Sequence, residues 1–253
     1  MDAIVRALAD QHDELDGLLL GLHGADWDRP VPDCPGWDVS DVVLHLAQTD
    51  ELVPASIEHG FAAAAALIGG IPSTADGTVD DLVGLMVAHQ RGAPGPAVHT
   101  RWRTASAAVR DLLSHSDPKR RLPWVITDLT ARTMATTRLS ECWIHTCDIA
   151  GAVGAQIPAT ERLWHIARLA WRTIPYAFAR AASPPLVGPV AAILTAPDGH
   201  PWDFGNDHPA TIVTGPALDF CKVAARRLDP ARSALTAEGA DSSRVLALLR
   251  TYG

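Results

Sequence analysis

The chain has 253 residues, of which 47% are hydrophobic and 20% are charged, and its formal net charge is -8 at pH 7. A chain of this length and composition buries a sizeable core, so a globular protein is expected and a disordered one is excluded. The acidic balance, with Lys119-Arg120-Arg121 as the longest basic run, argues against nucleic acid or an anionic membrane as the main partner.

Helical periodicity begins at the N-terminus. Apolar residues recur every three or four positions from Ala3 to Leu22, which predicts an amphipathic helix. The proline-rich segment from Trp27 to Trp37 predicts a rigid connector. Asp38 then has the character of an N-cap, with Asp41 three residues later, so a second helix is expected to start there. Pro54 is predicted to kink or divide that helix.

Further helical patterns continue to about residue 180. An alanine-rich helix is expected to end at Gly69-Gly70, and the glycine- and proline-rich stretch from Gly92 to Pro96 interrupts the pattern again. Gly154 stands where a glycine C-cap is expected. The remaining predicted helices cover Thr78–Gln90, His99–Leu113, Leu129–Val153 and Glu161–Arg180.

Beyond Pro184-Pro185 the pattern becomes strand-like and rich in turns, with a turn predicted at Pro197-Asp198-Gly199. We therefore predict a mainly α protein with two domains, a helical bundle over residues 1–183 and a small α/β domain over residues 184–253. The elements expected in the second domain are strands at Val187–Thr195, Trp202–Phe204 and Ala210–Val213, and helices at Pro216–Leu228 and Ser242–Arg250.

Several features indicate a cytoplasmic protein. The most apolar stretch, Phe61 to Ile71, is too short to span a bilayer. The N-terminus has acidic Asp2 and amphipathic spacing where a signal peptide needs a basic start and an apolar block. The four cysteines form no CxxC pair, so reduced thiols are expected. We expect a monomer or homodimer that acts on a small molecule, without nucleic acid or membrane partners.

One segment carries a line of polar side chains. Glu141 and His145 are four residues apart and Asp148 follows three later, so all three share one face of the predicted helix. Burial of such a line requires compensation, which a divalent metal ion would give. His45, within a strongly apolar segment, is the best third ligand from another helix. From spacing alone, however, a Glu-His pair is more often an ordinary helix-surface pair, and a lone histidine is more often a core residue.

Two strings resemble the mycothiol-dependent maleylpyruvate isomerase family, within the larger DinB-like metal-binding superfamily. The first is Cys-Pro-Gly-Trp-Asp-Val-Ser-Asp-Val-Val-Leu-His-Leu-Ala, from Cys34 to Ala47. The second runs from Arg138 to Gly154 and ends in Ala-Val-Gly. The segments from Thr195 to Gly205 and from Thr214 to Cys221 resemble a subgroup related to wyosine base formation. The resemblance covers nearly the whole chain.

The resemblance implies a DinB-like four-helix bundle with a small C-terminal α/β subdomain. It also implies that His45, Glu141 and His145 bind a divalent metal, most often zinc, and that mycothiol is a cosubstrate. Asp148 would orient His145 or act as a nearby base. Arg227, with Arg226 beside it, is the best match to a family arginine that contacts an anionic substrate or thiol, although a solvated helix end explains this pair equally well.

Three functions remain open from the sequence. The first is a metal-dependent isomerase or S-transferase that uses mycothiol on a small electrophile. The second keeps the metal as a Lewis acid for hydrolysis, elimination or cyclisation in secondary metabolism, without a thiol. The third is a non-catalytic protein that binds a small ligand. The string Thr146-Cys147 after His145 departs from the glycine and bulky residue frequent in relatives and weakens a strict isomerase assignment.

Overall fold

The computed structural model describes residues 1–69, 79–125, 127–205 and 207–251, and the chain divides into two compact units, Met1–Ile157 and Pro158–Gly253. The sequence placed the domain boundary at residues 183 and 184. In the structure the helix before that point, α7 (Leu163–Arg180), belongs to the second unit because it packs on α8, α9 and β4 of that unit.

The first unit is built from helices and, among its described residues, one short antiparallel strand pair. The strands are β1 (Arg121–Leu122) and β2 (Leu129–Thr130). The helices are α1 (Asp2–Leu20), η1 (Gly24–Asp26), α2 (Val39–His59), α3 (Phe61–Gly69), α4 (Val79–Gln90), α5 (Gly95–Ser114) and α6 (Ala131–Val153).

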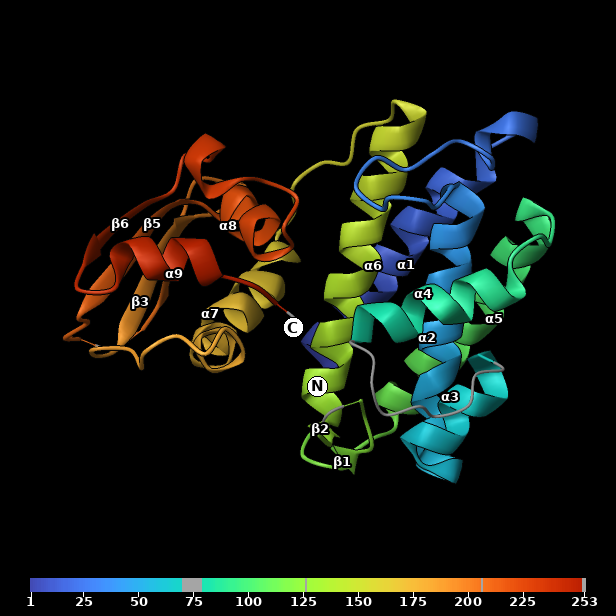
Figure 1. The fold of residues 1–253 in the computed structure, drawn as a ribbon, viewed down its shortest axis with the longest axis horizontal. Helices are drawn as coiled ribbons and strands as arrows, with labels where there is room; N and C mark the ends of the chain where they lie inside the picture. Colours follow the sequence, from blue (N-terminus) through green and yellow to red (C-terminus); the bar gives the residue numbers. More distant parts are fainter. Residues whose placement is uncertain (70–78, 126, 206, 252–253) are drawn as a thin grey trace. The chain divides into compact units, whose positions relative to one another are not determined.

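Helices α1, α2, α5 and α6 form a four-helix bundle (Figure 1). Within the bundle, α1 packs on α5 and α6, and α2 also packs on α5 and α6. Their apolar stripes meet in a core that contains Leu15, Val43, Leu46, Trp102 and Ile149, each at most 1% exposed. The predicted mainly α class, with a bundle followed by a small α/β unit, is confirmed.

Helix α2, which carries the first proposed ligand, starts as the sequence predicts and ends later. Asp38 is its N-cap and accepts a hydrogen bond from the Asp41 backbone N–H at 2.8 Å. Pro54 was predicted to kink or divide the helix; it does not divide it, since α2 continues through it to His59. The break comes at Gly60, whose φ of 78° a residue with a side chain rarely adopts.

Other helix ends follow from local chemistry. Helix α5 begins at Gly95, earlier than the predicted His99, because Pro96 fits the first turn, where no N–H donor is required. Helix α6 ends as predicted at Gly154, which is left-handed with φ 76°. The predicted helix stop at Gly70 and helix start at Thr78 lie outside the described residues.

The apolar segment predicted to be too short for a membrane span folds into α3 over its described part, and α3 packs on α2 and α4. Its buried residues include Ala64 and Ala65. Throughout the described ranges, no helix combines the length and the apolarity needed to cross a membrane.

The second unit joins a mixed sheet to helices. The strand order is β4-β3-β5-β6, with β3 parallel to β5 and the other pairs antiparallel. The predicted turn between β3 and β4 is present, with Gly199 at φ 89°. Strand β6 was not predicted, and α8 is shorter than expected. The elements are α7, β3 (Val190–Thr195), β4 (Pro201–Phe204), β5 (Thr211–Pro216), α8 (Ala217–Ala224), η2 (Pro230–Arg232), β6 (Thr236–Gly239) and α9 (Ser242–Leu248).

Candidate metal centre

Three side chains from two helices bring nitrogen and oxygen atoms together inside the bundle. His45 lies within α2, while Glu141 and His145 lie one turn apart on α6. Oε2 of Glu141 is 3.9 Å from Nε2 of His45 and 3.9 Å from Nε2 of His145. The imidazole rings meet edge to face with centroids 4.9 Å apart. The structure thus brings together the three residues that the sequence singled out as ligands.

These separations suit a shared cation better than direct hydrogen bonds. Hydrogen bonds between nitrogen and oxygen span about 2.7–3.2 Å, whereas two ligands about 2.1 Å from one ion lie up to about 4.2 Å apart. Oε2 of Glu141 is buried without a hydrogen-bond partner among the described residues. A buried carboxylate oxygen in this state is costly, and a bound cation would remove the cost. The residues present therefore fit a divalent ion.

The charges in the group also favour a cation. Burial alone raises the pKa of Glu141, but the His45 and His145 imidazoles and Arg138 outweigh it and bring this pKa to about 2. Burial lowers the pKa of His45, and the nearby His145 and Arg138 act in the same direction, against Glu141. An ionised carboxylate beside a neutral imidazole offers free lone pairs, which metal binding requires.

Asp148 holds His145 from the side opposite to Glu141. Nδ1 of His145 lies 2.9 Å from Oδ2 of Asp148, whose side chain is 1% exposed. A proton on Nδ1 donated to this carboxylate leaves Nε2 as the nitrogen with the lone pair, and Nε2 is the atom that faces Glu141. This contact fits one of the two roles predicted for Asp148, the orientation of His145, and the role itself stays a prediction.

Cys34, His145 and Asp148 form a second group that could hold an ion. Their distances describe a hydrogen-bonded chain, because the Cys34 thiol donates to Oδ2 of Asp148 at 3.4 Å and that same oxygen is 2.9 Å from Nδ1 of His145. Two ligands of a tetrahedral zinc ion lie about 3.3 Å or more apart, so 2.9 Å matches a shared proton better. We therefore assign this group to the support of His145.

A buried ion pair braces the two ligand-bearing helices. Nε of Arg138 on α6 donates to Oδ1 of Asp50 on α2 at 2.8 Å, and both side chains are 2% exposed. The same guanidinium donates to the Thr49 hydroxyl at 2.9 Å, and that hydroxyl donates to the His45 carbonyl oxygen. The pair thus ties the backbone of one ligand to the helix that carries the other two.

This ion pair was not predicted from the sequence, although the sequence contains a signal for it. Thr49 and Asp50 follow His45 by about one helical turn within a strongly apolar stretch, and Arg138 precedes Glu141 by three residues. Polar residues at such spacing on two buried helices indicate a partner across the bundle. Trp37, from the connector before α2, adds an aromatic wall, with its ring centroid 5.4 Å from that of His45.

Arg227 and Arg226 belong to the second unit and follow the end of α8. Arg226 is exposed and has a left-handed backbone with φ 60°. Arg227 is half-buried, and its Nη1 donates to the Ala225 carbonyl oxygen at 3.3 Å. The predicted contact of Arg227 with a substrate or thiol stays a prediction.

Comparisons with known proteins agree with this fold. Residues 8–150 match the family described as the mycothiol maleylpyruvate isomerase N-terminal domain. Two proteins from different strains of Mycobacterium tuberculosis, both described as uncharacterized, are 34% identical over 251 residues. That match covers 98% of this chain and 94% of each relative.

Two solved structures are similar over almost the whole chain. They are the mycothiol-dependent maleylpyruvate isomerase and a histidine-to-alanine mutant of it, with TM-scores of 0.63 and 0.62. The matches cover 94% of this chain and 92% of the solved chains, at 14% and 13% sequence identity. Likeness at this level of identity establishes a shared fold.

Proposed function

Because this chain belongs to the mycothiol maleylpyruvate isomerase N-terminal domain family, we propose that it is a divalent-metal-dependent enzyme that uses mycothiol. The proposed reaction is isomerisation of a small electrophilic substrate, or transfer of the thiol sulfur to it. The observation that carries the proposal is the convergence of His45, Glu141 and His145 with a buried Glu141 oxygen that has no hydrogen-bond partner among the described residues.

Each residue of the centre has a distinct role in this proposal. His45, Glu141 and His145 would hold the ion, and zinc suits two imidazoles and one carboxylate. When bound, the ion would supply Lewis acidity that lowers the pKa of a thiol in the site, and the thiolate is the reactive form. Asp148 keeps Nδ1 of His145 protonated and its Nε2 directed at the centre.

The chain's own side chains also shape the surroundings of the reaction. Trp37 lies against the His45 ring and limits the approach of water from that side. His45 and His145 are 6% and 7% exposed, so charges in the centre interact in a medium of low polarity. Arg227, in the second unit, is proposed to bind an anionic group of the thiol or the substrate.

The metal content of the purified protein tests the centre. We expect about one divalent ion per chain, since a single three-ligand site holds one. His145→Ala should lose that ion, while the matched variant His115→Ala should retain it, because the His115 side chain is 78% exposed on the surface of α5's end. Full metal stoichiometry in His145→Ala, measured by elemental analysis, would defeat the assignment.

Dependence on the thiol separates this proposal from the two other functions. In the cobalt-substituted protein, added mycothiol should change the visible absorption, because cobalt spectra respond to ligand changes. An unchanged spectrum, together with turnover of an electrophile in the absence of thiol, would favour a metal-dependent hydrolase, lyase or cyclase. Metal and ligand binding without any turnover would favour a non-catalytic binding protein.

A further inference from the structure

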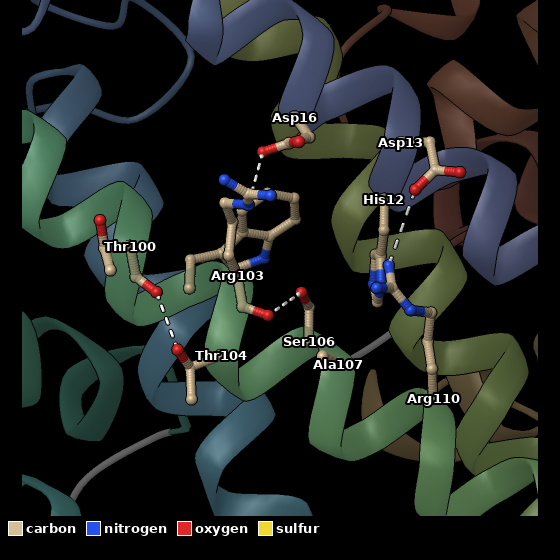
Figure 2. A pocket seen from close by; sticks show the side chains of 10 residues that line it. His12, Asp13, Asp16, Thr100, Arg103, Thr104, Ser106, Ala107 and Arg110 are labelled. Atoms are coloured by element: carbon tan, nitrogen blue, oxygen red, sulfur yellow. Dashed lines mark hydrogen bonds and ion pairs between the residues drawn. The ribbon is translucent and has the colours of Figure 1, made fainter.

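A pocket lies in the first unit, between α1 and α5 (Figure 2). It has a volume of about 450 Å³, within the range of small-molecule sites. Its inner end contains a histidine and a tryptophan, and two ion pairs cross its outer part. The residues that matter here are His12, Asp13, Asp16, Trp102, Arg103 and Arg110. None of them is a proposed metal ligand.

The inner end offers polar atoms that have no hydrogen-bond partner among the described residues. These are Nδ1 and Nε2 of His12 and Nε1 of Trp102, from side chains of residues that are 1% exposed. The two rings meet edge to face with centroids 5.7 Å apart. Each buried polar group left without a partner costs about 1–3 kcal/mol. A ligand that reaches this end could satisfy them.

The outer part contains two arginines, and one of them lies closer to its aspartate than the other does. Arg103 lies 3.3 Å from Asp16, which also contacts His99 at 2.6 Å. Arg110, by contrast, lies 3.9 Å from Asp13, beyond hydrogen-bond distance, and the Asp13 side chain is 79% exposed. Because an exposed ion pair of this kind is weak, the guanidinium of Arg110 can exchange it for another anion.

The electrostatic surroundings of His12 point the same way. Figure 2 shows His12 of α1 directed toward the guanidinium of Arg110 on α5. Burial, followed by the positive charges of Arg110 and Arg138, lowers the pKa of His12 to about 3. The imidazole is therefore neutral at pH 7, with one donor and one acceptor nitrogen, in a region of positive potential.

We propose that this pocket binds the oxyanion group of a small molecule, a carboxylate or a phosphate, between Arg110, His12 and Trp102. The oxyanion replaces Asp13 at the Arg110 guanidinium, which offers a planar pair of donors that matches it. The indole N–H of Trp102 and the donor nitrogen of His12 bind the inner part of the ligand. The residues that would hold the anion are separate from the three proposed metal ligands.

The indole N–H of Trp102 provides a direct test by NMR. The full-length protein with ¹⁵N-labelled tryptophan is titrated with succinate and, separately, with inorganic phosphate, at an ionic strength held constant with NaCl. The Trp102 resonance, assigned from Trp102→Phe, should shift saturably with at least one probe. The probe that binds more tightly distinguishes a carboxylate ligand from a phosphate ligand. No saturable shift with either probe would overturn the proposal.

Variants locate the binding. Arg110→Gln should weaken it at least tenfold, and the exposed Asp13→Asn should strengthen it by removing the competing carboxylate. The matched control Arg29→Gln, which alters the surface pair Arg29–Asp26, should leave it unchanged. Unaltered binding in both Arg110→Gln and Asp13→Asn would overturn the proposal. Retained binding in His145→Ala supports it, whereas loss there would place the anion at the metal centre and overturn it.

Discussion

Two helix pairs of the bundle each bury at least one imidazole nitrogen that has no hydrogen-bond partner among the described residues, yet their surroundings carry opposite charge. Between α2 and α6, the carboxylate of Glu141 lies 3.9 Å from an imidazole nitrogen of both His45 and His145. Between α1 and α5, the charges acting on His12 are the positive ones of Arg110 and Arg138. The same residue type thus suits a cation in one place and an anion in the other, because the neighbouring charge differs.

The largest expected effect comes from the charge of Glu141. Glu141→Gln keeps the shape of the side chain but removes the negative charge between the two imidazoles. We expect metal affinity to fall by more than about 100-fold. Mutation of a residue that only hydrogen-bonds a metal ligand already lowers metal affinity by about 10–100-fold. Competition with a chromogenic chelator measures it. Glu58→Gln is the matched control, because the Glu58 side chain is 76% exposed. Equal metal affinity in the two variants would show that the negative charge of Glu141 does not make this region suit a cation.

Arg138 links the two regions, because its charge lowers the pKa of His12 and also that of Glu141. Arg138→Met leaves Asp50 buried without its cation and should lower the free energy of unfolding by about 3–5 kcal/mol. Urea denaturation of the metal-free protein measures this loss. The double variant Arg138→Met, Asp50→Leu should recover most of it, because neither charge of this ion pair remains. A double variant as unstable as the single one would contradict this explanation.

The third effect is a pH dependence of stability that His12, between α1 and α5, should produce. The pKa of His12 is about 3 in the folded protein, against 6.5 when exposed, so the unfolded chain binds the extra proton between these values. Stability should therefore be intact above pH 6.5 and fall as the pH drops toward 3. At pH 4 the loss due to His12 is about 3 kcal/mol.

Comparison of the wild type with His12→Leu isolates that contribution. Arg110 on α5 and Arg138 on α6 face His12 in the wild type and remain in the variant, so the other groups titrate alike in both and cancel in the difference. Metal-free samples are used throughout. The difference in unfolding free energy should grow from pH 7 to pH 4, whereas His115→Leu, at an exposed site, should follow the wild type. Parallel pH profiles for wild type and His12→Leu would show that His12 takes up its proton freely.

The sequence singled out the three residues that the structure brings together, because local signals place each segment on a helix and the family resemblance joins the two segments in one ligand set. Asp38 and Asp41 mark the start of α2, and the spacing of Glu141 and His145 places them on one face of α6. What local spacing cannot give is the partner across the bundle. The contact of Arg138 with Asp50 joins residues far apart in the sequence, and so does the pocket between α1 and α5.

The domain boundary and the end of α2 could not be predicted from the sequence, because tertiary packing decides both. Helix α7 has the same periodicity as the bundle helices, and only its packing on α8 and α9 assigns it to the second unit. Pro54 is a helix breaker by local rules, yet tertiary packing carries α2 past it to Gly60. Local sequence therefore predicts where a helix starts more reliably than it predicts which other elements the helix packs against.

The smallest expected effect separates the two imidazoles of the metal centre from each other. Nδ1 of His145 has Asp148 as its partner at 2.9 Å, whereas Nδ1 of His45 has none among the described residues. Asp148→Ala should therefore weaken metal binding by about 10–100-fold, the usual value of such a supporting carboxylate. Asp148→Asn should weaken it less, because the amide oxygen still accepts the Nδ1 proton.

The ¹⁵N spectrum of the histidine side chains distinguishes orientation from a general loss of structure. In the wild type, His145 should be protonated at Nδ1, and Asp148→Ala should shift it toward a mixture of the two neutral tautomers while the His45 signals stay in place. Asp111→Ala, at a side chain that is 78% exposed, is the control for both measurements. If Asp148→Ala changed neither the metal affinity nor the tautomer of His145, packing alone would orient His145. The hydrogen bond from Asp148 would then not distinguish His145 from His45.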